Sequence, residues 1–291
     1  MTLAWITWSK PVSVWWACLL VVSSLNVGLW LVLQRYLQRR RFAAVVGAVR
    51  VELLLLLCGA YVFGCAFRSV LPRADVQRLC LFDTWLSSVL VGRSVATIAE
   101  VCFAIQWAIL LDQLARLAGL PILRQAARAV VVLIALAEGC SWYAVITTNY
   151  LGNAIENSLW ALCFSLIGIG LWSALNQFRG PLRIALGLAL TGIAGYVAFL
   201  AAIDVPMYLA RWNGDLANGK EQLGLFTGLW DVSSHWTVSR ELRAWQDEMA
   251  WMALYFSAAV WSSLALCPFS LVLDRWPRHA RAPAPPHAMQ I

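Results

Sequence analysis

Lysine and histidine are scarce in this chain of 291 residues, and charged residues of all kinds make up only 13% of it. Hydrophobic residues make up 61%, which is far from the composition of a water-soluble domain. The lysines and histidines are Lys10, Lys220, His235, His279 and His287. Because none of them lies within a predicted membrane span, the sequence excludes a retinal Schiff base and argues against intramembrane haem or His-rich metal sites.

The sequence motifs of common cofactor and metal sites are also absent. The chain has no Cys-x-x-Cys pair, no zinc-type Cys/His spacing, no Gly-x-Ser-x-Gly elbow with a histidine partner and no Walker-type phosphate loop. Most of the eight cysteines lie in apolar runs, where cysteine acts as a small apolar residue. Cys65 and Cys80 lie close enough to the outer side for a disulfide to stay an open question. We expect no metal ion, no cofactor and no ATP-driven step.

Long apolar runs dominate what is present. Runs of about 20 residues are long enough for a helix to cross a hydrocarbon core of roughly 30 Å. Seven can be drawn, at about 12–34, 51–71, 86–112, 128–148, 158–177, 183–203 and 250–272. The sequence therefore predicts an all-α, polytopic integral membrane protein with seven transmembrane helices in a domain over residues 1–274.

The arginines indicate the orientation of this domain, because cytoplasmic loops retain Lys and Arg. One set of alternate loops carries Arg35, Arg39, Arg40, Arg41, Arg50, Arg116, Arg124, Arg128, Arg179, Arg183, Arg275, Arg278 and Arg281. The opposite loops hold fewer bases and most of the loop acids. We predict an N-terminus outside, a cytoplasmic C-terminus and a location in a bacterial inner (plasma) membrane. This topology and the anionic inner leaflet account for the net charge of +7 without a nucleic-acid partner.

Two segments lie outside the predicted spans. Residues 204–249 should form a lid loop on the outer face, with a short amphipathic helix leading into the last span. The lid holds Trp212, Trp230, Trp236 and Trp245, whose rings either sit at the membrane interface or bind a ligand. The proline-rich tail over 275–291 should be a disordered cytoplasmic segment.

The most informative residues are Glu100 and Glu138, near the middle of adjacent apolar runs. An ionisable group at that depth is costly and by default marks function. Since the two runs are antiparallel, the carboxylates can reach similar depth, and two carboxylates in one apolar site would not both ionise readily. We predict them as the acid/base pair. The structural alternative is a protonated glutamate bonded to a backbone carbonyl.

Further polar and aromatic residues are placed to complete a site around this pair. Arg93, Glu100 and Trp107 are seven residues apart, which puts them on nearly one helix face. Trp142 follows Glu138 by one turn, and Arg93 or Arg68 is the available counter-charge. The predicted substrate-binding residues are Arg68, Arg93, Trp107, Trp142, Glu156, Asp204 and Tyr255. Together they predict a cavity that opens outward and narrows at the two glutamates.

Three functions remain open for such a cavity. The first is binding or translocation of a small solute or lipid headgroup with proton coupling. The second is a membrane-embedded enzyme that acts on a lipid or lipid-linked substrate by carboxylate acid/base catalysis. The third is a sensor or assembly subunit. The expected partners are the lipid bilayer, the solute or headgroup, and a second copy or another membrane subunit.

Overall fold

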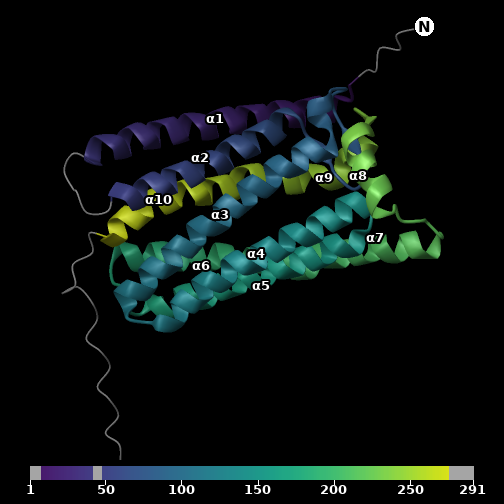
Figure 1. Ribbon diagram of the computed structural model, residues 1–291. Helices are drawn as coiled ribbons and strands as arrows, with labels where there is room; N and C mark the ends of the chain where they lie inside the picture. Colours follow the sequence, from purple (N-terminus) through teal and green to yellow (C-terminus); the bar gives the residue numbers. More distant parts are fainter. Residues whose placement is uncertain (1–7, 42–47, 275–291) are drawn as a thin grey trace, which may run out of the picture.

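The computed structural model describes residues 8–41 and 48–274, and the predicted tail over 275–291 lies outside them. Long helices run side by side to form a bundle (Figure 1). Within the described part, seven helical segments are long and apolar enough to cross a membrane, with mean hydropathy between 1.7 and 2.1. The prediction of an all-α protein with seven such helices is therefore confirmed.

The first five helices overlap the predicted spans, with ends that differ from the prediction by up to eight residues. They are α1 (Lys10–Arg41), α2 (Ala48–Val70), α3 (Val89–Ala118), α4 (Pro121–Thr147) and α5 (Tyr150–Leu175). Their ends follow local rules: Ser88 and Asn149 cap α3 and α5, and Gly119 ends α3 with a positive φ of 68°. Proline is favourable at the first position of α4, because the N–H that it lacks would have no partner within the helix.

The sixth and seventh helices are longer than predicted and contain π-helical segments. The sixth comprises α6 (Pro181–Phe199), η2 (Leu200–Asp204) and α7 (Val205–Ala217). The seventh comprises α9 (Leu242–Leu254), η3 (Tyr255–Ala259) and α10 (Val260–Asp274). About half of the predicted lid loop, over 204–217 and 242–249, is therefore helical extension of its neighbours, because hydropathy detects where an apolar run ends, not where a helix ends.

One end of the bundle carries a small sheet that the sequence did not predict. The sheet has three strands, β1 (Arg73–Ala74), β2 (Leu79–Cys80) and β3 (Thr237–Val238). Strand β1 pairs antiparallel with β2, and β2 pairs parallel with β3. The short helices η1 (Trp85–Ser87) and α8 (Leu225–Ser234) lie at the same end. Strands of two residues are too short to show a period of two in a sequence. We call this the sheet end, and the opposite end, with Arg39, Arg116 and Arg179, the arginine end.

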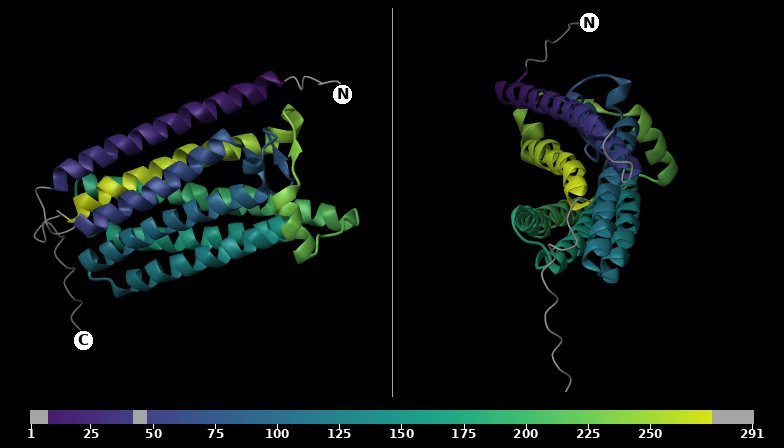
Figure 2. Two further views of the ribbon diagram at one scale, coloured as in Figure 1. Left: turned by 45° about the horizontal axis from the view of Figure 1, so that its top comes forward. Right: turned by 90° about the vertical axis from the view of Figure 1, so that its left-hand side faces the viewer.

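Hydrogen bonds fasten η3 and α10 of the seventh helix to one side of the bundle. Gln106 of α3 pairs with Ser263 of α10, and Gln113 pairs with Ser270. The two positions are seven residues apart on both helices. Asn26 of α1 donates to the carbonyl of Phe256 at 2.8 Å. The helix α6 packs instead on α5, and it lies on the same side of the bundle as α10 (Figure 2, right).

Many large apolar side chains point away from the bundle. Trp172 and Leu188 are each 69% exposed, and only 17% of the most apolar window of α1 and of the sixth helix is buried. Apolar area of this extent is unfavourable in water, whereas helices satisfy all their backbone groups internally and can face lipid. The exposed surface is that of a membrane protein.

Candidate functional site

Three helices bring four ionisable side chains, one arginine and three glutamates, together in the interior. The Arg93 guanidinium lies with Nη2 3.0 Å from Glu100 Oε2 and 2.6 Å from Glu138 Oε2. The same nitrogen lies 3.7 Å from Glu156 Oε1. We call these four residues the arginine–glutamate cluster. The predicted Glu100–Glu138 pair is thus a set of three carboxylates around one arginine.

Helix geometry explains how Arg93 reaches Glu100 two turns away. Side chains of a helix lean toward its N-terminus, so Glu100 leans toward Arg93. The extended Arg93 side chain is therefore long enough to reach the Glu100 carboxylate. Glu138 arrives from α4 and Glu156 from α5, where Gly152 lets the two helices approach: a Cβ there would lie 2.7 Å from the Cys140 carbonyl oxygen.

A second set of polar groups holds the carboxylates in place. The Tyr255 hydroxyl donates to Glu100 Oε1 at 2.8 Å, and the Asn153 amide donates to Glu156 Oε2 at 3.1 Å. Thr97 Oγ1 donates to Glu138 Oε2 at 2.6 Å and receives a bond from the Trp142 indole at 3.1 Å.

The cluster is buried and rich in negative charge. Its four residues are between 4% and 7% exposed, and full ionisation would leave an excess of two negative charges. Carboxylate oxygens of the three glutamates lie within 4.8 Å of one another. Among the described residues, this is the group that is close enough to hold a metal ion. The Arg93 guanidinium already supplies a cation to all three. The arrangement can hold or pass a proton.

A second charged corner lies toward the sheet end. Asp75 accepts from Arg73 Nε at 2.7 Å and lies 3.7 Å from Arg68 Nη2. Burial raises the pKa of the Asp75 carboxyl, but Arg73 and Arg68 outweigh burial, so its pKa lies below the ordinary value. Arg68 is therefore the partner of Asp75, not the counter-charge of the glutamates as the sequence suggested. Gly92 makes room for Arg73, because a Cβ at this position would overlap the arginine side chain.

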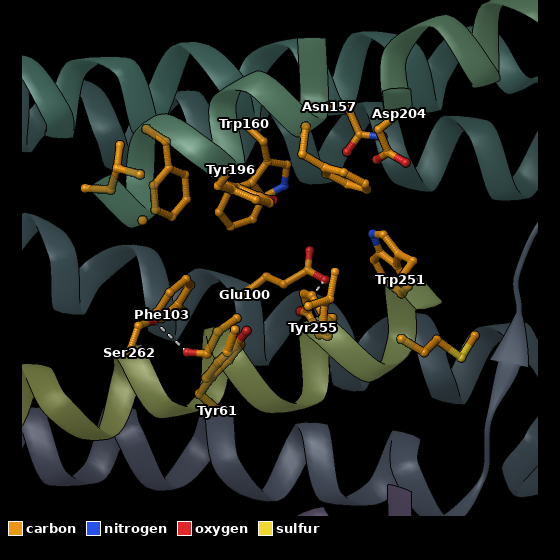
Figure 3. Close-up of a pocket in the computed structure, with 18 of the residues that line it drawn as sticks. Tyr61, Glu100, Phe103, Asn157, Trp160, Tyr196, Asp204, Trp251, Tyr255 and Ser262 are labelled. Carbon is orange, nitrogen blue, oxygen red and sulfur yellow. Dashed lines mark hydrogen bonds between the residues drawn. The ribbon is translucent and has the colours of Figure 1, made fainter. Parts of the chain in front are cut away.

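A cavity of about 710 Å³ connects both groups. Arg68, Arg73, Asp75, Arg93 and Glu100 line its polar end. Figure 3 shows part of the cavity, with Tyr196 and Trp160 on one side, Tyr255 and Ser262 on the other, and Glu100 between them. Aromatic rings dominate this part of the wall, for example Tyr61 stacked on Phe103 with centroids 4.6 Å apart.

The structure brings most of the predicted site residues to this cavity. Arg93, Glu100 and Trp107 lie along its wall, as their spacing predicts. The other predicted residues that line it are Arg68, Glu156, Asp204 and Tyr255. Glu138 and Trp142 do not line it, because Glu138 lies behind Arg93 and Trp142 supports Thr97.

The predicted shape of the cavity needs correction, and the structure argues against one of the two alternatives for the lid tryptophans, that they bind a ligand in this cavity. The cavity does not narrow to an end at the glutamates but continues past Glu100 as far as Leu110 and Phe269. None of the four lid tryptophans lines it: Trp245 is fully buried, and Trp236 donates to Asp83. Side-chain packing across separate helices decides both features, and no local pattern encodes it.

The sequence reasoning missed several residues of the site. Thr97 and Arg73 were not predicted as site residues, nor were Trp160, Tyr196 and Trp251, which lie in the cavity wall. Thr97 could have been found, because it lies four residues after Arg93 and three before Glu100, on the same helix face. The three aromatic residues carry no local signal that separates them from lipid-facing ones. Cys65 and Cys80 are buried free thiols.

Comparison of the chain with protein-family models, with curated proteins and with solved structures gives no match.

Proposed function

We propose that this protein binds a small solute or a lipid headgroup in the central cavity and moves it with proton coupling through the arginine–glutamate cluster. The observation that carries this proposal is that Glu100 and Arg93 belong to the cluster and also line the cavity. A ligand beside them can therefore alter the charge of the cluster, and the cluster can alter the affinity for the ligand.

The charge of the cluster supports proton coupling. Each uncompensated ion in an apolar interior costs several kcal/mol, so three carboxylates beside one guanidinium favour uptake of a proton. A ligand that adds or removes charge near Glu100 changes that preference. Linkage then requires that proton uptake change ligand binding by the same factor.

The helix irregularities support movement of the ligand. The π-helical segments η2 and η3 contribute Asp204 and Tyr255 to the cavity wall. Such segments are frequent at functional sites, and interrupted helices are common where transporters bind their substrates. The sixth and seventh helices are therefore the elements that we expect to move.

Orientation and location complete the proposal. Exposed arginines at the arginine end, such as Arg39 and Arg179, support a cytoplasmic location for this end under the positive-inside rule. The sheet end and the N-terminus then face outward, in a bacterial plasma membrane. The polar end of the cavity, near Asp75 and Gln77, lies toward the outside in this arrangement.

A second candidate function is an enzyme that acts on a lipid-linked substrate. The observation that favours it is that two carboxylates of the cluster, Glu100 and Glu156, line the cavity together with Arg68 and Arg73. Carboxyl groups can exchange protons with a substrate whose anionic group the arginines hold. Conversion of a bound lipid to a product of different mass would identify this function.

Native mass spectrometry of gently extracted protein at pH 6 and pH 8 tests the first proposal. We expect a co-purifying ligand whose occupancy changes between the two pH values. The Glu100→Gln/Glu138→Gln variant should lose either the ligand or its pH dependence, because neither amide can take up a proton. Glu221→Gln, at an exposed position outside the cavity, is the matched control and should behave as the wild type. An unchanged pH dependence in the double variant would refute proton coupling through Glu100 and Glu138.

A further inference from the structure

The cavity is amphipathic along its length. Its polar end holds the arginines and carboxylates, and the remainder is lined by aromatic and aliphatic side chains such as Phe103, Leu110 and Phe269. From Glu100 to Leu110 the wall follows α3 for ten residues, or about 15 Å. This is about half of the roughly 30 Å hydrocarbon core and therefore the depth of one leaflet.

The apolar part opens sideways between the sixth and seventh helices. Leu188 of α6 and Leu254 of α9 line the cavity although they are 69% and 59% exposed. The wall is thus continuous with the outer surface of both helices. Gly192 and Gly195 of α6 also line it, and a Cβ at either position would meet nothing within 4 Å. Both glycines therefore border open space.

The polar end presents unused hydrogen-bond donors. Arg68 and Arg73 are 5% and 2% exposed and line the cavity. Arg68 Nε and Arg73 Nη1 have no hydrogen-bond partner within the described part of the chain. Both guanidinium groups share Asp75 as their carboxylate, so this corner keeps one positive charge in excess. Buried, unpaired donors with excess positive charge favour an anionic ligand that accepts several hydrogen bonds.

We infer that the ligand is a lipid with a phosphate-bearing headgroup, which enters from the bilayer between α6 and α10. Its phosphate binds at Arg68 and Arg73, and its chain lies along the aromatic part of the cavity. This inference rests on the proposed function, because it names the class of ligand for the same cavity. The nearby carboxylates of the cluster stay compatible with an anion because Arg93 and bound protons offset their charge.

The test compares lipids with identical dioleoyl chains and different headgroups by native mass spectrometry of the detergent-solubilised protein. The probes are dioleoyl phosphatidic acid, dioleoylglycerol and a dioleoyl lipid with a trimethylammonium headgroup. We expect phosphatidic acid to bind about tenfold more tightly than the other two. Equal binding of all three, or a preference for the trimethylammonium lipid, would overturn the inference.

Two sets of variants, each with its control, locate the headgroup and the entrance. Arg68→Gln and Arg73→Gln should remove the preference for phosphatidic acid, whereas Arg116→Gln at the arginine end should keep it. Gly192→Trp should lower the occupancy of every dioleoyl lipid, because the indole fills the opening. Gly187→Trp is the matched control: Gly187 also lies on α6 in open space but does not line the cavity. Equal effects of both tryptophan variants would refute the lateral entrance.

Soluble probes separate a lipid phosphate from a free one. Inorganic phosphate and glycerol 3-phosphate, added in excess, should not displace phosphatidic acid, because they lack the chain that fills the apolar part. Displacement by either at similar concentration would mean that the site binds free phosphate. A phosphatidic acid preference that is independent of pH and of Glu100→Gln/Glu138→Gln would refute the coupling alone. A pH-dependent ligand that lacks phosphate would refute only the lipid inference.

Discussion

The hydroxyl of Tyr255 donates a hydrogen bond to Glu100 Oε1 at 2.8 Å, which joins the π-helical segment η3 to the middle of α3 across the cavity (Figure 3). Trp251 stacks on the Tyr255 ring with centroids 5.0 Å apart. A movement of the seventh helix must therefore either break this bond or carry Glu100 with it. This makes Tyr255 the direct link between the proposed moving helix and the proposed proton site.

Tyr255→Phe should remove that link while keeping the packing of the ring. The loss leaves a buried carboxylate oxygen without its donor, which costs about 1–3 kcal/mol. We expect a lower thermal unfolding temperature and a changed pH dependence of ligand occupancy, measured by thermal unfolding in detergent and by native mass spectrometry. Tyr143→Phe is the control, because Tyr143 is 46% exposed and its hydroxyl accepts only a 3.4 Å bond from Asn149. A Tyr255→Phe protein that matches this control in both measurements would contradict the link.

Arg93→Gln should be among the most destabilising substitutions in the chain. It leaves three buried carboxylates without their guanidinium, and breaking a buried ion pair costs about 3–5 kcal/mol. Adding Glu138→Gln should recover part of this loss, because it removes one of the uncompensated charges. Thermal unfolding of the single and double variants measures the recovery. The control Arg116→Gln breaks an exposed pair with Asp112 and should cost about 0–1 kcal/mol. Additive effects in the double variant would show that the two side chains act independently.

Gly92→Ala should displace Arg73 from its position over α3. The added methyl would overlap the arginine side chain, and overpacking of this kind costs about 1–3 kcal/mol. We expect a lower unfolding temperature and weaker retention of any anionic ligand. Gly139→Ala on α4 introduces the same methyl into open space and should be neutral or slightly stabilising, because alanine favours helix. The prediction fails if the two variants are equally stable.

Asp75 should make stability depend on pH in the acidic range. Burial raises the pKa of its carboxyl, but the attraction of Arg73 and Arg68 lowers it further, so the folded pKa lies below the ordinary 3.8. The contribution to stability is therefore present above about pH 4 and is lost as the pH falls through the folded pKa. Asp75→Asn should be less stable than the wild type at pH 7, and the difference should shrink below pH 4. Thermal unfolding between pH 3 and pH 7 measures this, with the exposed Asp83→Asn as control. A constant difference across this range would contradict it.

The orientation can be tested by labelling single cysteines in a variant that lacks the eight native ones. Lys220→Cys at the sheet end should react with a membrane-impermeant maleimide in intact cells, because this end is predicted to face outward. Arg179→Cys at the arginine end should react only after the membrane is permeabilised. Both positions are exposed, so accessibility depends on the side of the membrane. The reverse pattern would invert the topology and place the polar end of the cavity toward the cytoplasm.

Composition and apolar run length determined the class of this protein. Seven runs are each long enough for a membrane helix, and this property depends only on local hydropathy. The stripe of Arg93, Glu100 and Trp107 was also readable, because positions seven apart return to nearly the same face of a helix. The extension of the sixth helix to Ala217 could not be predicted from the sequence, since helix continuity at a membrane boundary depends on packing.

The composition of the site was decided only by the tertiary structure. The sequence marked Glu100 and Glu138 as a pair and Glu156 as a binding residue, but only the packing of α5 on α4 placed Glu156 beside that pair. Only the folded segment after α2 brought Arg73 and Asp75 to the cavity. The lateral opening likewise depends on which side of the bundle α10 is fastened to. Contacts between distant segments arise from the shapes of whole helices, so periodicity along one segment predicts its buried face but not its partners.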